Sequence, residues 1–138
     1  MENLNKLLAD LNILNTKLHT FHYNVVGHDF YQTHLFLEAE YDIVFANIDS
    51  VAETIKIEGG YPLGSLAEML SVTSIKEASS NDYTSKEIYA ILKDDYNTIL
   101  EECIKISEMD LKLATLDLMA DLIDVFSKKI WFLEASCK

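Results

Sequence analysis

Residues that break helices are almost confined to one short stretch of this chain. The 138 residues include four glycines and one proline, and four of these five fall between positions 59 and 64 (Gly59, Gly60, Pro62 and Gly64). Glycine and proline are the residues that most disfavour the interior of a helix. The sequence therefore predicts an all-α protein with one long interruption near its middle, and its length suits a single domain over residues 1–138.

Before the interruption, apolar residues recur at steps of three and four, as in amphipathic helices. A first helix over residues 3–25, capped by Asn3 or Asn5, would bury Leu4, Leu7, Leu8, Leu11, Leu14, Leu18 and Phe21. A second helix over residues 30–58 would bury Leu35, Tyr41, Phe45, Ile48, Ala52 and Ile55. Gly59-Gly60 then provides a left-handed stop.

After the interruption, two capping boxes mark helix starts. Ser65 with Glu68 predicts a short helix over residues 66–71, followed by a polar loop over residues 72–83. Thr84 with Glu87 opens the third long helix, whose inward residues would be Ile88, Leu92, Tyr96, Ile99, Cys103 and Ile106.

The fourth long helix is expected at about residues 115–135. Its inward residues would be Leu116, Met119, Ile123, Phe126, Ile130 and Leu133. Four long helices, with a short extra helix in the crossover between the second and third, predict a ferritin-like four-helix bundle.

The second predicted helix carries two pairs of metal-binding side chains. His34 and Glu38 are four residues apart, as are Asp49 and Glu53, so each pair projects from one helix face. His22 lies near the end of the preceding helix. Imidazole and carboxylate ligands suit iron, with zinc or manganese as competitors.

The separation of the two pairs decides how a metal site could form. Asp49 follows His34 by fifteen residues, which is about 22 Å of helix rise with an angular offset of about 60°. Bonds to a metal are only about 2 Å long, so one helix cannot bring both pairs to the same ion. A second copy related by a two-fold axis could, which favours two equivalent sites at the interface of a homo-oligomer.

Net charge and cysteine content limit the possible partners and the cellular compartment. The formal net charge of −12 disfavours a DNA or RNA partner and favours cations. Cys103 and Cys137 have no metal-binding spacing and fit two free thiols in a reducing compartment. No apolar run approaches the length of a membrane span, so we expect a cytoplasmic protein.

Other polar residues have simpler interpretations. Glu-x-x-His, the pair from which ferritin-like bundles build an internal di-iron centre, does not occur, so we expect an apolar core between the helices. His19 and His28 read as ordinary structural histidines. Asp117, Asp121 and Asp124 favour a solvated acidic face; the alternative, which Asp110 could join, is a channel that draws Fe²⁺ in at a three-fold axis.

Three stretches together resemble the Dps family of miniferritins (DNA-binding proteins from starved cells), and the likeness covers nearly the whole chain. They are LHTFHYNVVGHDFYQTH, IDSVAETIKIEGGYPLGS and KKIWFLEA. The resemblance implies metal ligands at His22, His34, Glu38, Asp49 and Glu53. It also implies a hollow dodecamer with two irons at each inter-subunit centre, oxidation of Fe²⁺ by hydrogen peroxide, and storage of the ferric mineral.

The chain departs from the family pattern in places. Tyr23 stands where many members have tryptophan, so an electron-donor role would pass to tyrosine or be lost. Leu35 and Ala39 replace carboxylates of some members, so mineral nucleation would use others, with Glu40 a candidate. The lysine-rich N-terminal tail that lets some members bind DNA is missing, so we expect protection without direct DNA binding.

Two alternatives to a ferroxidase stay open. One is a Dps-like shell that acts mainly as a zinc or general metal buffer, or as a surface ligand, without strong ferroxidase activity. The other is a purely structural helical assembly, which would take up no metal specifically.

Overall fold

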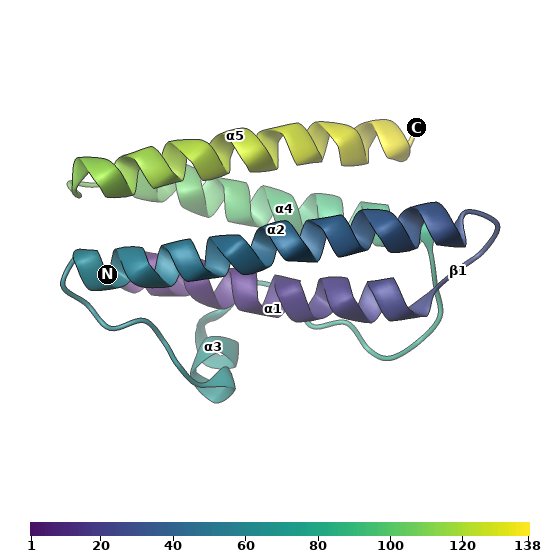
Figure 1. Cartoon of the computed structure of the whole chain (residues 1–138), viewed down its shortest axis with the longest axis horizontal. Coiled ribbons are helices and arrows are strands. Elements are labelled where there is room, and N and C mark those ends of the chain that lie inside the picture. Colours follow the sequence, from purple (N-terminus) through teal and green to yellow (C-terminus); the bar gives the residue numbers. More distant parts are fainter.

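Four long helices make up most of the computed structural model, which describes all residues, 1–138. They are α1 (Glu2–Asn24), α2 (Phe30–Ile57), α4 (Ser85–Ser107) and α5 (Leu113–Ser136). In Figure 1, α1 lies beside α2 in one layer, and α4 lies beside α5 in the other. The predicted all-α, ferritin-like bundle is confirmed.

The crossover from α2 to α4 runs the length of the bundle, so these two helices point in the same direction (Figure 1). It carries the short helix α3 (Leu66–Val72), which packs against α1. The end of the crossover, predicted as loop, contains β2 (Tyr83–Thr84), which pairs in parallel with β1 (Val25–Val26). Two-residue strands are too short to produce an alternating pattern, so the sequence did not reveal them.

The end of α2 follows the predicted glycine stop. Gly59 has a φ of +94°, which glycine adopts without strain. The Gly60 N–H donates to the Ile55 carbonyl at 2.9 Å, and the Gly59 N–H donates to the Lys56 carbonyl at 3.0 Å. These two bonds form a Schellman motif, which satisfies carbonyls that the helix end leaves free.

The predicted capping residues are confirmed at α3 and α4 but not at α1, although α1 begins within one residue of its predicted start. Thr84 and Glu87 form a reciprocal capping box at α4, and Ser65 accepts from the Glu68 N–H at α3. The cap position of α1 is Met1, without a side-chain bond. Asn5 instead fastens the crossover: its amide donates to the Tyr61 carbonyl, and its carbonyl accepts from a backbone N–H at residue 63.

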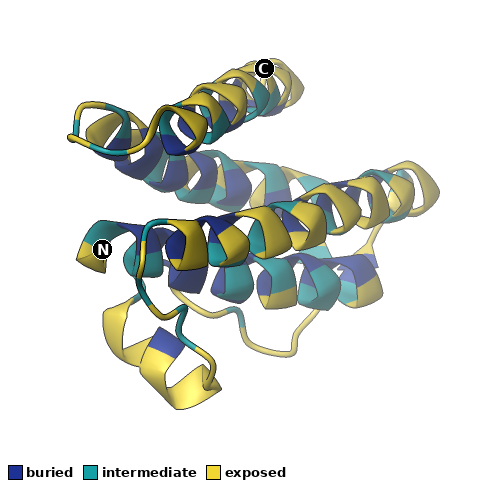
Figure 2. Cartoon of the chain, turned by 60° about the vertical axis from the view of Figure 1, so that its left-hand side comes forward, coloured by how far each residue is buried: buried dark blue, intermediate teal, exposed yellow.

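The core confirms the predicted inward residues of α1 and α4 and corrects the stripe of α2. Leu35 and Phe45 are 42% and 61% exposed, whereas Leu37, Val44 and Val51 are buried. Apolar residues occupy both sides of α2, so periodicity alone could not tell which side faces its own bundle. Figure 2 shows the exposed stripe along α2. On α5, Leu122 is buried, while the predicted Leu116 and Ile123 are only partly buried.

The core is apolar as expected, with one cluster of 25 buried residues, but two ion pairs also cross between the helices. Lys17 of α1 binds Asp95 of α4 at 2.7 Å. Lys129 of α5 binds Glu40 of α2 at 2.8 Å. Each pair joins two different helices, so no local pattern in the sequence indicates either one.

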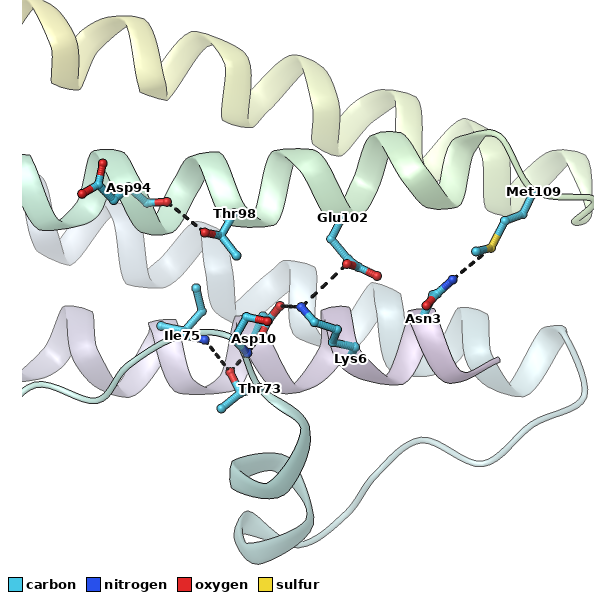
Figure 3. A network of polar contacts seen from close by, with 10 residues as sticks. Asn3, Lys6, Asp10, Thr73, Ile75, Asp94, Thr98, Glu102 and Met109 are labelled. Carbon is cyan, nitrogen blue, oxygen red and sulfur yellow. Dashed lines mark hydrogen bonds and ion pairs between the residues drawn. The ribbon is translucent and has the colours of Figure 1, made fainter.

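Asp10 fastens the crossover to the bundle from inside (Figure 3). Its carboxylate is fully buried and accepts from Lys6, from the Thr73 hydroxyl and from the Ser74 N–H, each at 2.7 Å. Lys6 also lies 3.7 Å from Glu102. A buried carboxylate with this many donors is well stabilised, so α1 holds the crossover in place.

No helix combines the length and the apolarity needed to cross a bilayer.

Candidate metal centre

His22 and His34 are locked together across the α1–α2 contact. The Nδ1 atom of His22 lies 2.8 Å from the His34 carbonyl oxygen, and the Nδ1 atom of His34 lies 2.8 Å from the His22 carbonyl oxygen. The two rings stack with centroids 3.7 Å apart and planes 14° apart. Two side chains distant in sequence are thus held in one fixed arrangement by the backbone of the other helix.

The carbonyl partners fix the tautomer of both rings. A carbonyl oxygen can only accept, so each Nδ1 carries the hydrogen and each neutral ring leaves the lone pair of Nε2 free. A histidine that binds a metal commonly donates its other ring N–H in this way, which fixes its orientation. His22 and His34 can therefore offer two neighbouring nitrogen ligands. The sequence suggested the residues but not these bonds, which need the packed helices.

Tyr41 and His19 extend the aromatic cluster. The Tyr41 ring stacks on His19 at 3.8 Å and meets the His22 ring edge-on at 5.3 Å. Burial, followed by the negative charges of Glu38 and Asp42, raises the pKa of Tyr41. Sequence reasoning missed this contact, because nothing in the periodicity of α2 pairs Tyr41 with α1.

The two carboxylates farther along α2 lie together on the surface. Asp49 and Glu53 are both exposed. A hydrogen bond with Asp49 raises the pKa of Glu53, and the negative charge of Asp49 adds to that effect. Two neighbouring carboxylates of this kind can provide a pair of hard oxygen ligands for a divalent cation.

These two half-sets of ligands do not meet within one chain. α2 is continuous from Phe30 to Ile57, so the rise from His34 to Asp49 remains about 22 Å. Accordingly, no group of three or more His, Cys, Asp or Glu side chains in the chain is arranged to hold a metal ion. Glu38 is exposed one turn from His34 and points away from the bundle core. The ligand set His22, His34, Glu38, Asp49 and Glu53 therefore stays a prediction about an assembly.

The other predicted positions fall outside this cluster. Asp117 and Asp121 are exposed on α5, as the acidic-face interpretation expects, and their channel role stays a prediction. Glu40, suggested for mineral nucleation, is 2% exposed and paired with Tyr96 and Lys129, so it cannot contact a mineral surface. That suggestion is wrong because Glu40 faces the interior of its own bundle.

Comparisons with known proteins agree with this fold over its whole length. The family described as "Ferritin-like domain" matches residues 1–138. DNA protection during starvation protein 2 of Bacillus anthracis is 36% identical over 138 aligned positions, covering 98% of this chain and 94% of that protein.

Two solved structures are similar to nearly the whole subunit. A Dps protein from Bacillus brevis superposes with a TM-score of 0.92 at 31% identity, covering 99% of this chain and 93% of that one. The DPS protein from Vibrio cholerae O1 is described as a member of a broad superfamily of ferritin-like diiron-carboxylate proteins. It superposes with a TM-score of 0.91 at 28% identity, covering 99% of this chain and 87% of that one. The chain therefore belongs to the ferritin-like proteins and, within them, to the Dps family of miniferritins.

Proposed function

We propose that the protein is a ferroxidase and iron-storage miniferritin. It oxidises Fe²⁺ with hydrogen peroxide at centres of two irons shared between subunits, and holds the ferric product inside a hollow dodecamer. The observation that carries this proposal is the His22–His34 pair, in which both rings are fixed by backbone carbonyls and both Nε2 lone pairs are free.

The donor set suits iron as the substrate. His22 and His34 would bind Fe²⁺ through neutral imidazole, which is a good ligand for this metal. Glu38, Asp49 and Glu53 would supply hard carboxylate oxygens, which favour Fe³⁺ over Fe²⁺ and so assist oxidation. Zinc could compete for the same ligands.

Each iron centre would be shared between two subunits, because the two groups of ligands are too far apart along α2 to meet in one chain. Each subunit would contribute the histidine pair with Glu38 to one centre, and Asp49 with Glu53 to the other. A two-fold axis makes the two centres equivalent. The exposed apolar side chains beside these ligands, among them Leu35 and Phe45, would be covered in the same contact.

Protection of DNA would then be chemical rather than physical. The B. anthracis relative is named for DNA protection during starvation. In this chain we assign that protection to the removal of Fe²⁺ and peroxide, whose reaction would otherwise release hydroxyl radical. The net charge of −12 supports protection without DNA binding, because negative charge on the protein repels the DNA phosphates.

A complementation experiment tests the shared centre. One variant carries His22→Ala and His34→Ala, and the other carries Asp49→Ala and Glu53→Ala; each alone should lose rapid Fe²⁺ oxidation by peroxide. When the two are unfolded together and reassembled, a mixed dimer contains one centre with no substituted ligand. We expect oxidation to return in the mixture, measured by stopped-flow absorbance of the ferric product.

The matched control replaces two exposed carboxylates on α4 and α5 that are not among the predicted ligands, Glu101→Ala and Glu134→Ala. It should oxidise iron at the rate of the unsubstituted protein. A mixture as inactive as its two components would contradict a centre shared between subunits. Metal uptake without faster oxidation would instead favour a metal buffer.

A further inference from the structure

A buried tyrosine, a carboxylate and an ammonium group meet inside the bundle, away from the ligands discussed above. The Tyr96 side chain on α4 is 1% exposed, and its hydroxyl donates to Glu40 Oε1 on α2 at 2.9 Å. The other carboxylate oxygen, Oε2, lies 2.8 Å from the Lys129 ammonium on α5. Three helices thus contribute one polar group each to a cluster in the core.

This cluster is complete within one subunit, and the proposed iron chemistry does not use it. A buried ion pair is weak support for stability, because desolvation of the two charges offsets most of their attraction. Its geometry instead resembles that of a redox-active phenol. The ring is shielded from solvent and packs edge-on against Phe126 at 5.2 Å, and its proton already points at a base.

We propose that Tyr96 is a redox-active residue that holds one oxidising equivalent inside the bundle. A one-electron oxidant of the hydroxyl-radical class, such as Fe²⁺ and peroxide generate, takes one electron from the phenol and becomes hydroxide. The phenolic proton passes along the hydrogen bond to Glu40 Oε1. A neutral tyrosyl radical remains, and a one-electron reductant such as Fe²⁺ restores the phenol when the proton returns from Glu40.

Burial makes the coupled proton transfer necessary. Burial, followed by the negative charge of Glu40, raises the pKa of Tyr96 well above its usual value, so the phenol stays protonated until it is oxidised. A radical cation in an apolar core is costly, whereas transfer to Glu40 leaves a neutral ring. The surplus positive charge then lies on Lys129, whose side chain is 21% exposed and can be solvated.

The cluster also has a short covalent connection to the aromatic cluster that contains Tyr41 and His22. Glu40 precedes Tyr41, whose ring lies edge-on to His22 at 5.3 Å. Oxidising equivalents that escape at the histidine pair therefore have a route inward, from Tyr41 through the adjoining backbone to the Glu40–Tyr96 hydrogen bond. This link to iron chemistry rests on the proposed function; the redox role of Tyr96 does not.

The test uses the assembled protein without iron. Flash photolysis of tris(bipyridine)ruthenium with persulfate supplies a one-electron oxidant, and freeze-quenched samples are measured by electron paramagnetic resonance. We expect a long-lived tyrosyl signal that is lost in Tyr96→Phe. The control is Tyr89→Phe on the same helix, because the Tyr89 hydroxyl pairs with the neutral Thr33 hydroxyl at 3.0 Å and has no base to accept its proton. It should keep the signal.

A double variant, Glu40→Gln with Lys129→Met, removes the base and its counter-ion together and so leaves no unpaired buried charge. We expect the long-lived signal to disappear there as well, while circular dichroism shows the native helix content. A long-lived signal that survives in Tyr96→Phe would overturn the assignment to Tyr96. One that survives in the double variant would overturn the role of Glu40. Because this arm contains no iron, both outcomes are independent of whether the protein is a ferroxidase.

With Fe²⁺ and peroxide present, a spin trap reports the hydroxyl radical that escapes. Tyr96→Phe should raise the yield of trapped radical over that of the Tyr89→Phe control, while the rate of Fe²⁺ oxidation stays the same. An unchanged yield, with the iron-free signal present, would overturn the link to iron chemistry alone.

Discussion

Glu38 and Glu40 lie two residues apart on α2 and have opposite environments. Two residues turn a helix by about 200°, so one carboxylate faces away from the bundle and the other faces its core. Glu38 is exposed and makes no side-chain hydrogen bond or ion pair within the subunit. Glu40 is bound by Tyr96 and Lys129.

The same contrast holds for the groups around these two carboxylates. The outward cluster leaves the Nε2 lone pairs of His22 and His34 free, and its three carboxylates have no cationic partner within the subunit. The inward cluster instead uses its charges within one chain. Unused ligands on a surface point to something that binds there, while a satisfied buried cluster contributes to the subunit itself. Substitutions in the inward cluster should therefore change stability, and substitutions in the outward cluster should change metal response.

The largest expected effect is on the inward side. Glu40→Ala leaves Lys129 without its counter-ion and the Tyr96 hydroxyl without an acceptor, so the free energy of unfolding should fall by about 3 kcal/mol. The partial exposure of Lys129 places this value at the low end of the usual range. Urea denaturation measures it, with Glu38→Ala as the matched control, which should change stability by less than about 0.5 kcal/mol. Equal losses in both variants would remove the contrast between the two faces.

A second prediction concerns the outward face and uses Zn²⁺ as a probe that does not turn over. Binding only to the folded assembly stabilises it by about 2.7 kcal/mol at one hundred times the dissociation constant. The melting temperature should therefore rise with Zn²⁺, and the rise should be largely lost in Asp49→Ala/Glu53→Ala. Glu101→Ala/Glu134→Ala should keep it. A rise of the same size in all three proteins would mean that Zn²⁺ binds elsewhere.

A third prediction concerns buried ionisable groups in the core, and alkaline titration tests it. Burial raises the pKa of Cys103 to about 12, and the negative charge of Glu102 adds to this effect. The thiol of the unfolded chain ionises near pH 9, while the folded protein keeps its proton. Stability is therefore complete below about pH 9 and falls by about 1.4 kcal/mol per pH unit above it. Tyr96, whose pKa is also raised, adds to the fall above about pH 10.

Denaturation at pH 8, 9.5 and 11 measures this slope. Cys103→Ala should flatten it, and Cys137→Ala, which changes a thiol next to the C-terminus, should leave it as it is. A slope that is equally steep in Cys103→Ala would show that other groups are responsible for the alkaline loss.

The sequence predicted the helices well because their signals are local. Glycine pairs, capping boxes and apolar spacing all lie within a few residues of the features they specify, and α2, α3 and α4 begin or end within about a residue of the predicted positions. Even so, the stripe of α2 was misplaced. Leu35 and Phe45 are as apolar as the residues that are buried, and only the position of the other helices decides which side is inside.

The candidate site was predictable in its residue types but not in its contacts. The spacing of His34, Glu38, Asp49 and Glu53 is local to α2 and could be found by counting. The carbonyl bonds between His22 and His34 depend on how α1 packs on α2, and the burial of Glu40 depends on partners from α4 and α5. Such long-range pairs leave no periodic trace in one sequence.

Direct binding to DNA is the smallest expected effect. The chain has 11 basic and 23 acidic residues, and Lys6, Lys17 and Lys129 are already committed to ion pairs within the subunit. Counterion release, which drives non-specific binding, therefore has few free cations to work with. No band shift is expected in a gel at about 0.15 M salt, near physiological ionic strength.

A version of the chain with a lysine-rich segment added before Met1 is the positive control, and its band shift should weaken as salt rises. A band shift with the unextended protein would contradict the proposal that the protein protects DNA without binding it. Without such a shift, resistance of DNA to Fe²⁺ and peroxide in the presence of the protein must come from the outward ligands. That resistance should then disappear in Asp49→Ala/Glu53→Ala but persist in Glu101→Ala/Glu134→Ala, because only the first pair of substitutions removes carboxylates that would bind iron.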